Sequence, residues 1–104
     1  MKNEQEIENE IQAKGLNAPR LTPDAITNTI KEIYFNVVPG TTLTFCALTL
    51  RNGFVVTGES AAASPANFDE EIGRNIAFEN ARNKIWMLEG YLLRERLHNV
   101  EASA

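Results

Sequence analysis

Apolar and polar positions change their spacing twice along the chain, which separates helical ends from an extended middle. Residues 3–14 hold two isoleucines four positions apart among polar side chains, the pattern of a short surface helix. Residues 34–58 are rich in β-branched and aromatic side chains, which favour strands. From about residue 69 to 98 the helical spacing returns. The pattern predicts an α+β fold: short N-terminal helices, a small antiparallel sheet, then one long or kinked helix, or two helices.

The first helix is expected to end at Gly15, and the second helix has a clear start signal. Thr22 is a favourable N-cap, and Pro23 suits the first helical position because its missing N–H would have no partner there. We expect this second helix to end between Lys31 and Tyr34. Its predicted apolar face consists of Leu21, Ile26, Ile30 and Ile33.

An Asn-Gly dipeptide at 52–53 separates two apolar runs and predicts a β-hairpin with a type I′ turn, which needs positive φ at both residues. A two-residue loop would pair Leu50 with Val55 and Thr49 with Val56. The predicted strands are residues 34–38, 41–50 and 54–58, followed by a loop over residues 59–66.

The last helix is expected to start with Asn67 as its N-cap and Glu70 completing a capping box, and to reach about His98. Its length would be ~45 Å at ~1.5 Å per residue, more than the mid-thirties of Å that a compact domain of this size spans. We therefore expect the helix to bend at Gly90 or to project onto a partner.

This helix carries two apolar stripes on different faces. The stripe expected to face the sheet is Ala77, Ala81, Ile85, Leu88 and Leu92. The second stripe is Trp86, Leu93 and Leu97. Because a three-stranded sheet cannot cover both, the second stripe must contact the N-terminal helices, another copy of the chain, or both. We predict these three residues as an oligomer interface.

Composition and charge then narrow the classes of function. The 104 residues predict a single domain, 1–104, in which 1–20 form a mobile helix and connector beside a core of 21–104. A net charge of −4 argues against DNA or membrane surfaces as partners. The N-terminus lacks a signal-peptide core, and Cys46 is the only cysteine, so we expect a cytoplasmic location.

No set of residues forms a catalytic constellation. His98 is the only histidine and lies near the C-terminus, and Cys46 has no CxxC neighbour. Asp69, Glu70 and Glu71 are typical of a helix N-terminus, although a small hydrolase using Asp69 or Glu71 is an open third hypothesis. Neither metal-ligand spacing nor a glycine-rich phosphate loop is present. We expect no enzymatic activity, no cofactor and no metal.

Two residues suit a small anionic ligand instead. Arg74 falls on the sheet-facing side of the last helix near its start, where backbone N–H groups attract anions. The alternative is an ion pair with Glu70 or Glu71. Phe68 would offer a flat ring at the same place for stacking on a base, or would only fasten the helix start to the core.

Five short motifs follow one another in the order found in a family of small tailed-phage proteins, which the chain resembles. They are Cys46–Phe54, Gly58–Ala61, Asn67–Gly73, Ala77–Ala81 and Ile85–Leu93, with Ala18–Pro23 also similar to some members. The chain also resembles the phage anti-Thoeris sponge proteins. These proteins bind cyclic ADP-ribose isomers made by bacterial TIR-domain defence enzymes and sequester them without hydrolysis. Some also hold cyclic di- or trinucleotides in a hexamer.

The resemblance implies a sheet followed by C-terminal helices, with homo-oligomers (a dimer or hexamer) built through those helices inside the infected host cell. The first hypothesis is a non-enzymatic sponge in which Arg74 takes phosphate and Phe68 stacks on adenine. Asn75, Asn80 and Arg94 would add polar contacts from this or a neighbouring chain. The alternative is a phage protein that binds and inhibits a host protein through its helical surface. An aromatic ring beside an arginine favours the sponge, and a flat apolar patch favours the alternative.

Overall fold

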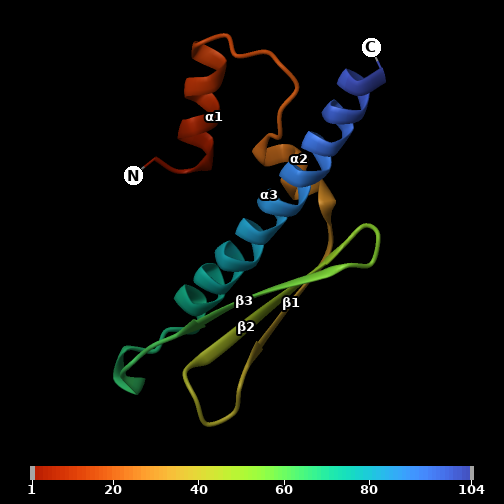
Figure 1. Cartoon of the computed structure of the whole chain (residues 1–104). Coiled ribbons are helices and arrows are strands. Elements are labelled where there is room, and N and C mark those ends of the chain that lie inside the picture. Colours follow the sequence, from red (N-terminus) through yellow and green to blue (C-terminus); the bar gives the residue numbers. More distant parts are fainter. Residues whose placement is uncertain (1, 104) are drawn as a thin grey trace.

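The protein forms one three-stranded antiparallel sheet with a long helix across one face (Figure 1). A computed structural model describes residues 2–103, so Met1 and Ala104 of the predicted domain lie outside the described residues. The elements are α1 (Glu4–Ala13), α2 (Pro23–Thr29), β1 (Ile30–Val37), β2 (Leu43–Leu50), β3 (Val55–Ala61), the 3-10 turn η1 (Pro65–Asn67) and α3 (Glu70–Ser103). The predicted α+β fold is confirmed.

The first two helices begin where the sequence predicts. The Asn3 side chain accepts a hydrogen bond from the Glu6 amide at 2.8 Å and caps α1. The Thr22 hydroxyl accepts one from the Ala25 amide at 3.1 Å and caps α2. Beyond the end of α1, Gly15 adopts a φ of 64°, a conformation that favours glycine and stops a helix.

The predicted end of the second helix, between Lys31 and Tyr34, is wrong. Helix α2 stops at Thr29, and β1 begins at Ile30. Ile30 and Ile33 therefore belong to the strand and not to a helical face. Their β-branched side chains suit a strand, and pairing with β2 supplies the hydrogen bonds that decide between the two states.

The predicted hairpin is present, with a different turn. The Gly53 amide donates to the Leu50 carbonyl at 2.9 Å, and the Leu50 amide donates to the Phe54 carbonyl at 2.8 Å. Gly53 has a φ of 89°, whereas Asn52 does not have positive φ. The loop therefore has three residues, a type I turn followed by a glycine bulge, in place of the predicted type I′ turn.

The different turn shifts the register of the hairpin by one residue. Thr49 pairs with Val55 and not with Val56. Leu48 pairs with Val56, and both side chains are buried on the face toward α3. A one-residue slip would have sent one of them to the opposite face. Strand β3 also continues to Ala61, so the first three residues of the predicted loop belong to the strand.

Helix α3 starts and ends later than predicted. The cap is Asp69, whose carboxylate accepts the Ile72 amide at 3.0 Å, while Asn67 lies in η1. The helix then runs through Gly90 to Ser103 without a break. Its 34 residues span ~51 Å, in agreement with a longest molecular dimension of 58 Å. The helix is thus unbroken at Gly90, and the partner onto which it was expected to project stays a prediction.

The core lies between the first half of α3 and the inner face of β2 and β3. A Cβ on Gly58 would lie 2.2 Å from the Ala77 carbonyl oxygen and 2.3 Å from the Ala81 nitrogen. The backbones of β3 and α3 therefore touch, which only small residues allow. Leu88 and Leu92, predicted to face the sheet, are 38% and 46% exposed. The buried apolar residues are Ile26, Cys46, Leu48, Leu50, Val56, Ala77, Ala81 and Ile85.

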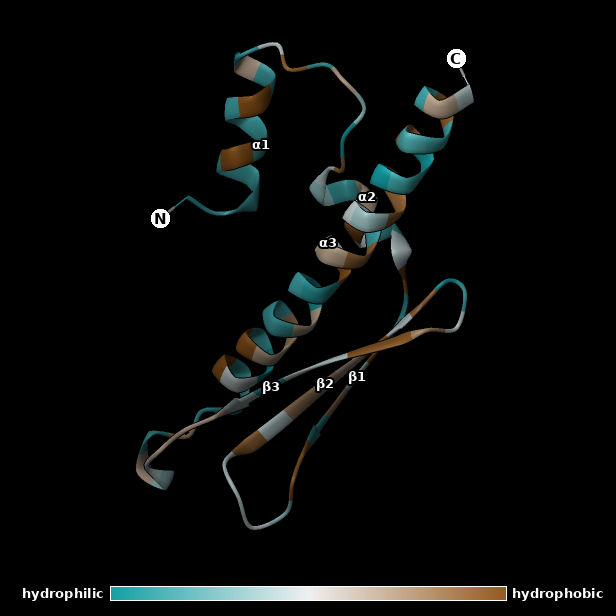
Figure 2. Ribbon diagram, viewed as in Figure 1, coloured by the Kyte–Doolittle hydropathy of each residue, from teal (hydrophilic) through white to brown (hydrophobic). Residues whose placement is uncertain are grey.

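Figure 2 shows the same division by hydropathy. Apolar residues recur along the strands and along α3, whereas α1 is mostly hydrophilic with two apolar positions. Those positions are Ile7 and Ile11, the narrow stripe predicted for a surface helix. Helix α1 thus contributes little to the apolar core.

The contact between β3 and α3 predicts opposite effects for two glycine-to-alanine changes. Gly58→Ala should lower the free energy of unfolding by about 2–3 kcal/mol or more, because backbone atoms must move to admit the methyl group. Gly90→Ala is the matched control, since its Cβ would meet only Leu21 Cδ1 at 3.9 Å. It should raise the free energy of unfolding by up to about 1 kcal/mol through helix propensity. Denaturant titration measures both, and equal stabilities would contradict the described packing.

Candidate functional site

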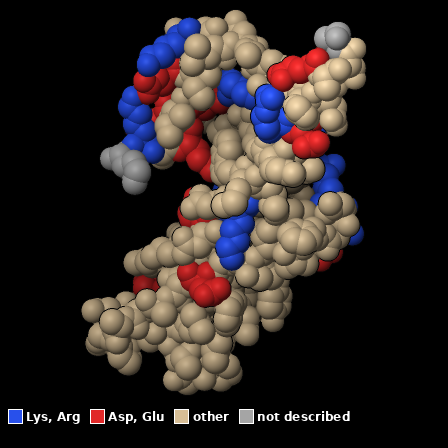
Figure 3. Space-filling model, viewed as in Figure 1, with Lys and Arg blue, Asp and Glu red and all other residues tan. Residues whose placement is uncertain are grey.

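Phe68, one of the predicted ligand residues, lines a hollow at the end of the sheet. The hollow has a volume of about 480 Å³ and lies between the β1–β2 turn and the segment that follows β3. Its lining residues are all uncharged: Gly40, Thr41, Thr42, Ala62, Ala63, Pro65 and Phe68. Figure 3 shows that this end of the molecule carries few charges, whereas charged side chains gather over α1.

The Phe68 ring lies against the first turn of α3. A Cβ on Gly73 would lie 3.8 Å from Phe68 Cε1, an ordinary contact distance, but only 2.8 Å from Thr44 Oγ1, so the missing side chain lets the helix approach β2. Phe68 is half-buried. One part of the ring therefore packs against α3, as the structural alternative predicted, and the ring also borders the hollow.

Arg74 follows directly after Gly73 and is half-buried. The predicted alternative, an ion pair with Glu70 or Glu71, is not found among the ion pairs of residues 2–103. The N-terminus of α3 has fewer N–H groups available for an anion, because the Asp69 carboxylate already accepts a hydrogen bond from one of them. An anion here would therefore depend on the Arg74 guanidinium more than on the helix dipole.

Arg74 is not among the residues that line the hollow, and the other three predicted ligand residues do not line it within one chain either. Asn75 is exposed on the side of α3 that faces away from the sheet. The Asn80 side chain donates to the Glu59 carbonyl at 2.8 Å and ties α3 to the edge of β3. Arg94 lies ~30 Å along the helix from Arg74 and pairs with Glu101 at 3.0 Å. Only a neighbouring chain could bring Arg94 to the hollow.

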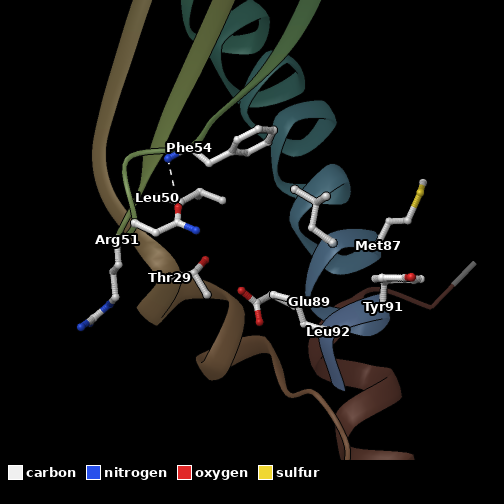
Figure 4. Close-up of a pocket in the computed structure, with 10 residues that line it drawn as sticks. Thr29, Leu50, Arg51, Phe54, Met87, Glu89, Tyr91 and Leu92 are labelled. Carbon is white, nitrogen blue, oxygen red and sulfur yellow. Dashed lines mark hydrogen bonds between the residues drawn. The ribbon is translucent and has the colours of Figure 1, made fainter. Parts of the chain in front are cut away.

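A larger hollow of about 580 Å³ lies at the other end of the sheet, between the β2–β3 hairpin and residues 87–92 of α3. Phe54 projects from the hairpin toward the helix, while Arg51 points away from it (Figure 4). Glu89 is the one charged side chain that α3 contributes to the lining. Met87 and Tyr91 are 76% and 71% exposed. This groove, mostly apolar and holding a carboxylate, suits apolar side chains better than phosphate.

The structure places the three predicted interface residues on a partly covered side of α3. The Trp86 indole N–H donates to the Glu4 carboxylate at 2.8 Å, so α1 covers this ring in part. Leu93 and Leu97 are half-buried. Trp86 of the second stripe thus contacts an N-terminal helix, which is one of the open alternatives. Met87 and Tyr91 are more exposed than any of the three.

Arg82, which the sequence did not single out, is the centre of a buried polar cluster. It is 6% exposed. Its Nε donates to Glu4 Oε2 at 2.9 Å and its Nη2 to Glu4 Oε1 at 3.0 Å. Its Nη1 donates to the Thr27 hydroxyl at 3.1 Å and its Nη2 also to the Pro23 carbonyl at 2.9 Å. Partners 78 positions apart leave no local sequence signal.

A second ion pair orders the connector after α1. Arg20 donates through Nη1 and Nη2 to the two oxygens of Glu8, at 2.6 and 2.7 Å, in a bidentate pair. Gln12 adds a hydrogen bond to the same carboxylate at 2.7 Å. Glu8 is buried, so this pair fixes the chain that leads from α1 to α2.

Both clusters lower carboxyl pKa values. Hydrogen bonds from Arg82, opposed by desolvation and assisted by Trp86, hold the pKa of Glu4 below its ordinary value near 4.5. Hydrogen bonds from Arg20 and then Gln12 lower the pKa of Glu8 to about 2. The interactions that lower these pKa values stabilise the fold at a pH above the ordinary carboxyl pKa. This stabilisation is lost as the pH falls and the carboxylates become protonated.

Other candidate chemistry is limited. Cys46 is buried, and burial raises the pKa of its thiol, as expected of an unreactive cysteine. Within residues 2–103, no group of three His, Cys, Asp or Glu side chains could hold a metal ion. No helix in the described part of the chain is long and apolar enough to cross a membrane.

Acid should release α1, because protonation of Glu4 weakens the hydrogen bonds that join α1 to Arg82 and Trp86. Trp86 is the only tryptophan, so its emission reports on its contact with Glu4. We expect the emission to shift to the red as the pH falls below 4.5 toward about 2. Glu4→Gln should already be shifted at neutral pH, whereas the exposed Glu6→Gln should behave as wild type. Far-UV circular dichroism recorded in parallel separates release of α1 from unfolding. An unshifted wild-type spectrum at pH 2, with the fold intact, would contradict this account.

Comparison with known proteins places the chain in a family. The sequence model of the phage protein (N4 Gp49/phage Sf6 gene 66) family matches residues 21–97, about three-quarters of the chain. Searches among curated proteins and among solved structures give no match. The matched region begins near the end of the connector that follows α1, and it covers α2, the sheet and most of α3. The chain belongs to the phage protein (N4 Gp49/phage Sf6 gene 66) family.

Proposed function

We propose that this phage protein is an anti-defence protein that binds and sequesters a cyclic nucleotide signal, a cyclic ADP-ribose isomer or a cyclic di- or trinucleotide. It acts without cleaving the ligand, as a homo-oligomer in the host cytoplasm. The observation that carries the proposal is Arg74, a half-buried residue with no ion-pair partner among residues 2–103. It directly follows Gly73, beside which the Phe68 ring lies. The ligand class comes from the resemblance of the sequence to the phage anti-Thoeris sponge proteins.

The hollow at Phe68 suits such a ligand in size and chemistry. Its volume of about 480 Å³ falls within the roughly 300–1,000 Å³ typical of small-molecule sites. Phe68 offers a ring for stacking on a base, and Arg74 offers a charge for phosphate. An aromatic ring and an arginine near the same helix start favour the sponge over a protein that inhibits a host protein through a flat apolar surface. Arg94 of a neighbouring chain would complete the contacts.

Self-association is the second part of the proposal. The exposed Met87 and Tyr91 border the apolar hollow. It is a poor phosphate site because Glu89 lines it while the Arg51 side chain points away from α3. A second copy that packs its own α3 there would remove this apolar surface from water. We propose that the assembly forms through this half of α3, with Leu93 and Leu97 at its margin.

The oligomer should dissociate when a charge enters this surface. Met87→Asp should raise the dissociation constant on the order of a hundredfold, because a carboxylate would be buried among apolar groups. Met87 is 76% exposed in one chain, so the fold should survive. Leu93→Asp should also dissociate the assembly, with some loss of stability because Leu93 is half-buried. Light scattering measures the assembly.

Asn99→Asp is the matched control, since it adds the same charge on the same helix ~18 Å from Met87. It should leave the oligomer intact. A wild-type chain that is folded and monomeric at tens of micromolar would overturn this part of the proposal.

The ligand site is tested by Arg74→Ala and Phe68→Ala. Removing Arg74 should weaken binding of cyclic ADP-ribose or cyclic di-AMP by about 1.5–3 kcal/mol, roughly ten- to a hundredfold. The loss should shrink as salt rises, because screening already weakens the wild-type contact. Removing Phe68 should cost about 1–3 kcal/mol of stacking with little dependence on salt. Calorimetric titration at two salt concentrations measures both.

Matched controls are Arg96→Ala, an exposed arginine on the same helix, and Tyr34→Ala, an exposed ring on β1 that lines neither hollow. Both should bind as wild type, and nucleotide recovered from the complex should be chemically unchanged. If instead Phe68→Ala and Arg74→Ala only lower the melting temperature and bind normally, inhibition of a host protein becomes the better proposal. A cleaved product would overturn the non-enzymatic assignment.

A further inference from the structure

We propose that Arg82 and Trp86 form a carboxylate-binding site whose occupant is exchangeable: Glu4 from α1 of a second copy takes the place of Glu4 of the same chain. The inference goes beyond nucleotide binding and does not depend on it. It concerns how α1, which lies outside the region matched to the family, is held on the rest of the protein.

The site has three N–H groups that converge on one carboxylate. Arg82 Nε and Nη2 donate to the two oxygens of Glu4 at 2.9 and 3.0 Å, the paired geometry that guanidinium and carboxylate groups favour. The Trp86 indole N–H donates to Glu4 Oε2 at 2.8 Å. One buried positive charge and three donors match a single carboxylate in charge and geometry.

The Arg82 side chain of this carboxylate-binding site has hydrogen-bond partners besides Glu4. Thr27 and the Pro23 carbonyl of α2 accept two further hydrogen bonds from the Arg82 guanidinium. These residues, with Arg82 and Trp86, all lie within the region 21–97 matched to the family, and Glu4 does not. When Glu4 leaves, the guanidinium keeps its hydrogen bonds to α2 but loses its counter-charge and the paired hydrogen bonds to a carboxylate. Another carboxylate should therefore replace it.

Helix α1 is tied to the rest of the protein by little else. Among the hydrogen bonds and ion pairs of residues 2–103, those of Glu4 alone join α1 to residues beyond the connector. The Glu8–Arg20 pair stays within α1 and its connector. A hollow of about 240 Å³ lies between α1 and Trp86, and Ile7 is 47% exposed. Apolar packing thus holds α1 only weakly.

The connector allows exchange. Nine residues, 14–22, join α1 to α2, and an extended chain of that length reaches ~30 Å. The same contacts form within one chain and between two chains, so exchange of an identical element has a low free-energy penalty. Association of two copies raises the local concentration of the second α1 and favours the exchange. A second copy of the chain is therefore the proposed alternative source of the carboxylate.

Complementation between two variants tests the proposal. Glu4→Ala has an empty site and keeps Trp86, and its emission should be shifted to the red of wild type. The silent partner carries Arg82→Met and Trp86→Phe, so it offers Glu4 but has neither site nor tryptophan. Adding the partner in excess should move the emission of Glu4→Ala at least half of the way back to the wild-type spectrum.

The matched control is the same partner with Glu4→Ala added, which should restore nothing. If Arg82→Met does not fold, Trp86→Phe alone serves as the silent partner and should restore a smaller part of the shift. Equal spectra with the partner and its control would overturn the exchange. A Glu4→Ala spectrum identical to wild type would overturn occupation of the site itself.

Discussion

The backbone contact between β3 and α3 is the constraint on which the rest of the structure depends. Because Gly58 has no side chain, Ala77 and Ala81 bring the helix against the strand, and the core there is thin. This close contact with the sheet buries side chains only from the first half of α3. The remainder, from about Met87 onward, passes the end of the hairpin and presents apolar side chains to its surroundings. The need for a second surface follows from this geometry.

Polar contacts hold the N-terminal part, where apolar packing is scarce. Glu4, Arg82 and Trp86 join α1 to α3, and Glu8 with Arg20 orders the connector. These hydrogen bonds and ion pairs are directional and depend on the charge state of the carboxylates, whereas apolar packing in the core does not. The N-terminal helix is therefore the part of the molecule most open to pH and to exchange.

Local chemistry made much of the fold predictable from sequence. Thr22 with Pro23 marked a helix start, and Asn-Gly marked the hairpin, because these residues act on their own backbone. The exact register was not predictable, since the same dipeptide serves two turn types. The Glu4–Arg82 pair could not be predicted from the sequence, because its partners are 78 positions apart and meet only in the folded chain. Phe68 and Arg74 were identified from their place at a helix start, and their ligand is a proposal.

The second half of α3 is proposed to be a binding surface that association covers. Amide hydrogen exchange can be compared between the wild-type oligomer and Met87→Asp. We expect faster exchange in Met87→Asp for residues 87–97 and for the hairpin at 50–54. Exchange over residues 73–85, which pack on the sheet, should be unchanged. Equal protection of residues 87–97 in both proteins would contradict it.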